Sequence, residues 1–165
     1  MSTSIAGNVT FQQGGTVTFR GGCVLPPSVV GNDQVSAVSP IGAAKVEHQY
    51  MPILAQPHGT AAVADRRVVH VARSAGTVEQ FRAGPVVPAT GDSTVTVDLR
   101  KNGTTVLSSG VLIESSTAAY AVLSGAIASA SYVAGDVLEV VIAVSAGTGT
   151  LPQGVWGQAT LREAA

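Results

Sequence analysis

Residues 93–113 constrain the fold more than any other part of the chain. They read STVTVDLRKNGTTVLSSGVLI, in which apolar and polar residues alternate before the Asn102-Gly103 pair and the following run is rich in Val and Thr. A period of two places apolar side chains on one face of a strand, and such residues favour a pleated, half-buried surface. Asn-Gly accepts the positive φ angles of tight hairpin turns. The sequence therefore predicts an antiparallel β-hairpin at the centre of the chain.

The register of this hairpin has two solutions. A two-residue turn places Leu99 opposite Val106, whereas a three-residue loop places Val97 opposite Leu107. In both solutions Val95, Val97 and Leu99 share one face of their strand. The sequence leaves the choice open.

Small residues dominate the rest of the chain and favour the same structural class. The chain has 19 glycines, only 12% charged residues, and a hydrophobic share of 45% that includes many alanines. This composition suits short strands and tight turns better than long amphipathic helices. About eight strands within roughly a hundred residues predict an all-β fold, an antiparallel β-sandwich or jelly-roll-like domain. Outside the hairpin, we expect strands at residues 67–72, 76–83, 118–123, 127–132, 137–144 and 154–161.

The strand expected at residues 137–144 is the most apolar of these. Its predicted core face consists of Leu138, Val140, Ile142 and Val144, whereas the other face carries Glu139 among small apolar residues. That second face suits contact with another sheet, an arm or a neighbouring subunit. A central sandwich strand with one tolerated glutamate explains it equally well.

The N-terminal segment, residues 1–26, has a different pattern. The sequences NVTF, TVTF and CVLP follow one another, separated by glycine-containing turns. Strands of about four residues bury little surface alone, so they need another surface or identical copies of themselves. The predicted capsid or subunit interface residues are Val9, Phe11, Val17, Phe19, Val24 and Leu25. The alternatives are an ordinary hairpin at the edge of the main domain, or these six residues filling the core of that domain.

Pro26-Pro27 ends this segment, because consecutive prolines lack amide donors and favour an extended path. The predicted organisation is an N-terminal β arm at 1–26, an extended connector with short helical turns at 27–60, and a β-sandwich domain at 61–165. The N-terminus does not resemble a secretory signal, and polar residues interrupt the longest weakly polar stretch, 118–145.

Charge and cysteine content argue against several partners. A net charge of −1 with scattered basic residues disfavours nucleic acid and anionic membranes as partners. The single Cys23 is best explained as a small buried residue, and it offers no cysteine-rich metal site. We therefore expect no cofactor and no metal.

No arrangement of residues predicts catalysis. His48, His58 and His70 lack metal-ligand spacing, and His70 is expected on the polar face of its strand. The GTGT sequence at 147–150 resembles a phosphate loop only superficially, because no helix follows it. We predict that the protein is not an enzyme. A hydrolase would need two converging carboxylates from a set with no informative spacing: Asp92, Asp98, Glu114, Asp136 and Glu139.

The NVTF and TVTF segment, the stretch SPIGAAKVEHQY, and the motifs TVTVDLRKNGTTVLS and AGDVLEVVI together resemble small virion proteins of tailed bacteriophages. Those are capsid decoration proteins and head or tail fibres. The resemblance implies a homotrimer made in the bacterial cytoplasm, attached by its N-terminal part to the major capsid protein on the virion surface. The alternative is a fibre tip that binds a receptor or carbohydrate through loops 148–156 or 115–120. Trp156 is then either a sugar platform or, more simply, a core or interface aromatic.

Overall fold

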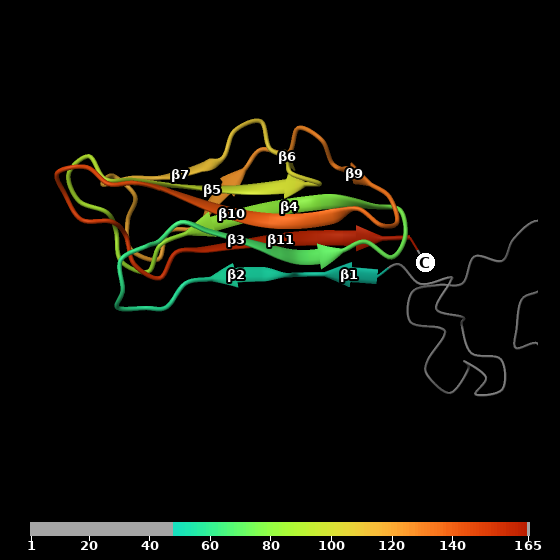
Figure 1. Ribbon diagram of the computed structural model, residues 1–165, viewed down its shortest axis with the longest axis horizontal. Coiled ribbons are helices and arrows are strands. Elements are labelled where there is room, and N and C mark those ends of the chain that lie inside the picture. The colour runs from blue at the N-terminus through green and yellow to red at the C-terminus, as the bar shows by residue number, and fades with distance from the viewer. Residues whose placement is uncertain (1–47, 165) are drawn as a thin grey trace, which may run out of the picture. The chain divides into compact units, whose positions relative to one another are not determined.

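The computed structural model describes residues 48–164, and within them the chain forms strands and no helix (Figure 1). Each strand pairs antiparallel with its neighbours. The strands are β1 His48–Tyr50, β2 Ile53–Ala55, β3 Asp65–Val71, β4 Gly76–Gly84, β5 Thr94–Lys101, β6 Thr104–Thr105, β7 Val111–Ile113, β8 Leu123–Gly125, β9 Ser131–Tyr132, β10 Val137–Ser145 and β11 Trp156–Glu163.

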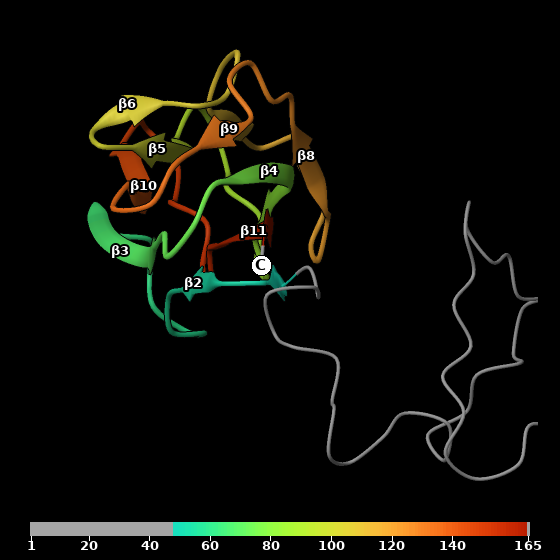
Figure 2. The ribbon, with the colours of Figure 1, turned by 90° about the vertical axis from the view of Figure 1, so that its right-hand side faces the viewer.

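These strands form two sheets that pack as a β-sandwich, which confirms the predicted fold class. One sheet has the order β1-β11-β4-β8 and the other β3-β10-β5-β6. β2 also pairs with β11, β9 with β4 and β7 with β5, so the eleven segments occupy eight strand positions. The resulting orders, 1-8-3-6 and 2-7-4-5, are those of a jelly roll. Figure 2 looks along the strands, with β3, β10, β5 and β6 facing β11, β4 and β8.

The central hairpin adopts the two-residue turn. Arg100 lies opposite Thr105 and Lys101 opposite Thr104. Asn102 and Gly103 have φ angles of 50° and 85°, the two positive values that such a turn requires. The Val106 amide donates to the Leu99 carbonyl at 2.9 Å, so the first of the two predicted registers is the one that forms.

The core lies between β5 and β10 of one sheet and β4 and β11 of the other. The predicted core faces of β5 and β10 are confirmed, since their side chains are buried apart from Val144, which is partly buried against the core. Phe81 and Leu161 meet them from the other sheet. The sheets approach closely at Gly157, where a Cβ atom would lie 2.8 Å from a methyl group of Val97. The buried residues of β5 and β10 are Val95, Val97, Leu99, Leu138, Val140 and Ile142.

Two stretches differ from the sequence prediction. β1 and β2 lie within 27–60, the range predicted as a connector, and both pair with β11. The strand expected at 118–123 is mostly loop, because Tyr120 takes a left-handed φ of 58° and donates its amide to the Pro85 carbonyl. Of the strand expected at 127–132, only β9 and one isolated bridge at Ile127 form.

The sandwich has two different ends. β1 begins and β11 finishes at the same end, because His48 lies opposite Glu163 (Figure 1). We call this the terminal end. The opposite end, the loop end, carries the four connections at 56–64, 85–93, 114–122 and 146–155.

Candidate functional site

The residues predicted as an interface lie outside the described residues 48–164. They are Val9, Phe11, Val17, Phe19, Val24 and Leu25. The surfaces that the structure does describe are the two edges of the sandwich, its two ends and the outer faces of its sheets.

One edge, which we call the open edge, lies between β2 and β3. Each is the last strand of its sheet on this side, and the two strands do not pair with each other. A groove of about 510 Å³ runs between them. Its lining residues are Pro52, Ile53, Leu54, Ala55, Arg67, Val68 and Val69.

Exposed apolar side chains concentrate beside this groove. Five of the nine large hydrophobic residues that are exposed in residues 48–164 lie on β2, on β3 or within two residues of them. Single exposed apolar residues are ordinary, but several along one unpaired edge indicate an interaction surface. The five are Met51, Ile53, Val63, Val68 and Val71.

The first half of β3 is charged and the second half is apolar. Asp65 and Arg67 lie opposite the core residues Ile142 and Val140, and they form a salt bridge of 3.0 Å with each other. Charges on the inward side of an edge strand hinder pairing with another sheet. No charged residue occurs from Val68 to Val71, so this half of β3 lacks that protection.

The opposite edge, which we call the closed edge, is bridged by backbone hydrogen bonds. After β6 the chain leaves its sheet, and Leu107 pairs with Ile127, which follows β8 of the other sheet. The Ser108 amide donates to the Ala126 carbonyl at 2.8 Å, and the Ala128 amide to the Val106 carbonyl at 2.8 Å. Val106 and Leu107 are buried. At the closed edge the two sheets are therefore joined by main-chain hydrogen bonds.

A buried polar pair ties the two sheets together at the terminal end of the open edge. Glu163 of β11 is only 1% exposed, and its Oε1 lies 2.7 Å from Nε2 of His70 on β3. The Arg73 amide donates to the same carboxylate oxygen at 3.2 Å. These contacts satisfy a carboxylate that would otherwise be costly to bury.

Two tyrosines complete this cluster. The Tyr50 ring of β1 lies 5.0 Å from the His70 ring, and the Tyr132 ring lies 6.4 Å from it. The Tyr132 hydroxyl donates to the Arg162 carbonyl at 3.3 Å. Burial, followed by the nearby Glu163 carboxylate, raises the pKa of Tyr132 to about 12. The cluster therefore joins β1, β3, β9 and β11, and it lies where β1 begins.

The prediction that His70 occupies the polar face of its strand is wrong. His70 lies opposite the core residue Leu138, and its side chain is mostly buried. A bulge between the Leu138 and Glu139 pairings shifts the alternation of β3 by one residue. Glu163, the partner that makes this position tolerable, is 93 residues away in sequence, so no local pattern identifies it.

The five carboxylates from which a hydrolase would need two each have a hydrogen-bond or salt-bridge partner of their own. Asp92 accepts from the hydroxyl of Thr148 at the loop end, and Asp136 accepts from the side-chain amide of Asn102 at the terminal end. Glu114 accepts from the Ser116 hydroxyl. The other two, Asp98 and Glu139, lie on the outer face of the β5–β10 sheet with arginine partners: Asp98 with Arg100, and Glu139 with Arg66.

The Glu139 face of β10 is an outer face of the sandwich. β10 pairs with β3 on one side and β5 on the other, so it is a central strand. Arg66 meets the Glu139 carboxylate at 2.6 Å, and Arg100 lies opposite it in the register. Of the two explanations for this face, the central strand with one tolerated glutamate agrees with these contacts.

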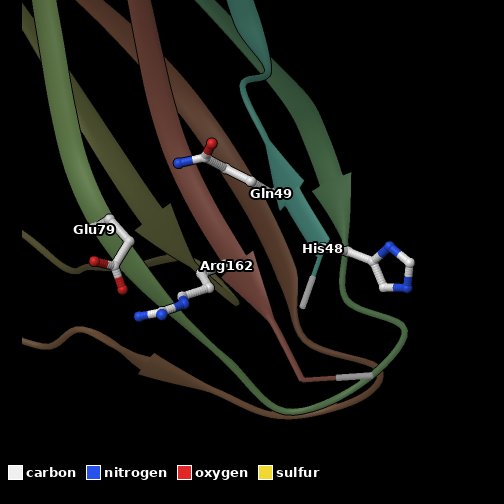
Figure 3. A pocket seen from close by; sticks show the side chains of 4 residues that line it. All are labelled: His48, Gln49, Glu79 and Arg162. Carbon is white, nitrogen blue, oxygen red and sulfur yellow. The ribbon is translucent and has the colours of Figure 1, made fainter. Parts of the chain in front are cut away.

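A small polar hollow of about 300 Å³ lies on the outer face of the other sheet, near the terminal end. In Figure 3, the Glu79 carboxylate and the Arg162 guanidinium point into the same space, while the His48 ring points away. Glu79 accepts from the Thr77 hydroxyl at 2.6 Å. Among the described residues, no group of three His, Cys, Asp or Glu side chains is arranged to hold a metal ion. The hollow therefore offers hydrogen-bonding groups and side chains of opposite charge.

The loops at the loop end are tied to one another. The Thr148 hydroxyl donates to Asp92 at 2.8 Å, and the Thr150 amide donates to the Thr90 hydroxyl at 2.8 Å. Hydrogen bonds from Thr148 lower the pKa of Asp92. The Thr148 amide, which a bound phosphate would require, donates to this carboxylate, so the 147–150 segment acts as a braced loop.

No protein family matches the chain, and no curated protein is significantly similar to it. Residues 48–164 contain no helix that could cross a lipid bilayer.

Proposed function

We propose that this protein is a structural component of a tailed-phage virion. It forms a homotrimer that binds the major capsid protein on the outer surface of the capsid and stabilises the shell. The resemblance of its N-terminal segment and β motifs to phage decoration proteins suggests this function, and the geometry of the sandwich supports it.

The observation that carries the proposal is the difference between the two ends of the sandwich. The described chain begins at His48 and finishes at Ala164 near the same end, and four braced loops form the other end (Figure 1). A domain held through a segment before His48 would therefore present its loop end outward. Jelly rolls occur in viral capsid and lectin domains, which is a fold-level analogy and agrees with this reading.

The core of the sandwich also supports a separate role for the arm. The largest inward side chains of β5 and β10 are 0–1% exposed, and they belong to one buried cluster with Phe81, Ala159 and Leu161 of the other sheet. Residues 1–26 contain one charged residue, Arg20, and three apolar pairs that need a surface elsewhere. The capsid and the neighbouring subunits would supply that surface.

The mechanism is cementing through buried area. Each arm would add short strands and apolar side chains to the capsid surface, and the three arms of one trimer would engage neighbouring capsid subunits together. Joining weak sites in one molecule raises the effective concentration of each further contact to roughly the millimolar range. The shell is then stabilised because separating two capsid subunits would also remove a bound arm.

Deletion of residues 1–26 tests the proposal. Co-sedimentation with empty capsids should show full occupancy for the whole chain and loss of binding for the deletion variant. The double substitution Val9→Asp and Phe11→Asp provides a variant of full length, and it should also lose capsid binding. Circular dichroism should show the same β spectrum in all three proteins. Full occupancy by the deletion variant would contradict the arm assignment.

A recognition module is the second candidate, and Tyr120 favours it. This residue is 73% exposed in loop 114–122 and holds a left-handed φ of 58°. An exposed aromatic ring in such a backbone conformation is an unusual feature at the loop end. A glycan array with the full chain should give a specific signal that Tyr120→Ala removes. A cement protein should give none.

A further inference from the structure

We infer that the open edge receives residues 16–19, Thr-Val-Thr-Phe, from a neighbouring copy of this chain. The segment adds a strand along the apolar half of β3 and covers the groove between β2 and β3. This inference rests on the homotrimer of the proposed function and assigns the surface through which its copies are joined.

The pattern of the segment matches the groove. In an extended strand, Val17 and Phe19 lie on one face, and Thr16 and Thr18 on the other. The groove offers one apolar wall, in which Ile53 and Val68 are 54% and 55% exposed, and the side away from it faces solvent. Strand addition of this kind supplies main-chain hydrogen bonds to the unpaired edge and places alternate side chains in the groove.

The charges of the two partners are compatible. Residues 16–19 carry no charge, so docking them buries no unpaired ion. Among the described residues that line the groove, Arg67 is the only charged one, and its Nε lies 3.0 Å from the Asp65 carboxylate. The segment therefore meets an edge without an uncompensated charge.

The length of the connecting chain suits a neighbouring copy. Residues 20–47 separate Phe19 from β1, and these 28 residues span up to roughly 95 Å when extended. A nine-residue strand such as β10 is only about 30 Å long. The connector is thus several times longer than a return to its own edge requires. Passing each arm to the next copy would produce a ring of identical interfaces.

Cysteine crosslinking of the full chain tests the inference. In a Cys23→Ser background, Val17→Cys is combined with Val68→Cys at the open edge. The matched control combines Val17→Cys with Val122→Cys, because Val122 is 57% exposed but lies at the loop end, away from the open edge. Mixing ¹⁴N- and ¹⁵N-labelled protein before oxidation separates disulfides between chains from those within one chain.

We expect at least tenfold more interchain disulfide in the Val68 variant than in the Val122 variant, as mixed-label peptides and covalent trimers. Equal yields, or disulfides only within one chain, would overturn the inference. Capsid co-sedimentation of the unoxidised proteins is measured in parallel. An interchain disulfide without capsid binding would contradict the proposed function but support the inference. Capsid binding without the interchain disulfide would support the proposed function but contradict the inference.

Discussion

The two edges of the sandwich differ in how the two sheets are joined. At the closed edge, residues 106–108 cross to residues 126–128, so backbone hydrogen bonds join the two sheets. At the open edge, β2 and β3 only approach each other, and the buried Glu163–His70 pair is the polar tie between the sheets at its terminal end. Unpaired strand edges attract other strands. The comparison therefore locates the surface on which a partner would add.

The two halves of β3 at the open edge differ in their protection against strand addition. Its charged half, Asp65 to Arg67, is protected against strand addition, whereas the half from Val68 to Val71 is not. At the closed edge, residues 106–108 are instead joined to residues 126–129 by backbone hydrogen bonds. The unprotected half of the open edge is therefore the place where we propose that a neighbouring copy adds a strand.

The largest expected difference is between the unfolding free energies of two truncation variants, one at each edge. Leu107→Ala at the closed edge should lower the free energy of unfolding by about 3 kcal/mol, because Leu107 is buried and its removal leaves a cavity. Val68→Ala at the open edge should cost less than about 1 kcal/mol. Urea unfolding of the full chain measures both. Similar losses of unfolding free energy in the two variants would contradict the difference between the edges.

Loss of the Glu163–His70 pair at the open edge should have an intermediate effect on the free energy of unfolding. His70→Ala leaves the buried Glu163 carboxylate without its 2.7 Å partner, so we expect a loss of about 2 kcal/mol. Tyr132→Phe removes only the longer 3.3 Å hydrogen bond and should cost less than about 1 kcal/mol. Thermal unfolding compares the two variants. If His70→Ala is no worse than Tyr132→Phe, the pair does not hold this edge.

The smallest effect is a dependence on pH at the turn between β9 and β10. The Val133 amide, and then the Asn102 side chain, donate to Asp136 and lower its pKa. A lowered folded pKa adds stability above the unfolded value of about 3.9, and that stability is lost as the pH falls through the folded pKa. The melting temperature should therefore drop in this acidic range. Asp136→Asn should flatten the drop, and an unchanged profile would contradict the assignment.

The sequence was a good guide to the fold where its pattern is local. The alternation in β5 and β10, together with Asn102-Gly103, predicted the hairpin and the core faces correctly. β1 and β2 escaped prediction because each has three residues, Pro52 separates them from a common period, and their pairing with β11 spans over a hundred residues. Short strands of this kind are defined by their partner and not by their own residues.

The candidate site was harder to predict for a physical reason. The bulge in β3 reverses the side on which His70 lies, and a bulge leaves no reliable signature in a run such as RRVVHV. The open edge lies between two consecutive strands, β2 and β3, which belong to different sheets and do not pair with each other, and neither strand's own sequence shows this. The predicted interface residues lie outside 48–164, so their role stays a prediction.

Hydrogen exchange on the full chain tests the difference between the edges most directly. In an edge strand paired on one side only, alternate amides are protected, because the others point away from the neighbouring strand. If a neighbouring arm covers the apolar half of β3, successive amides from Val68 to Val71 should all exchange slowly, like those of residues 106–108. Protection only at alternate positions of β3 would contradict the account.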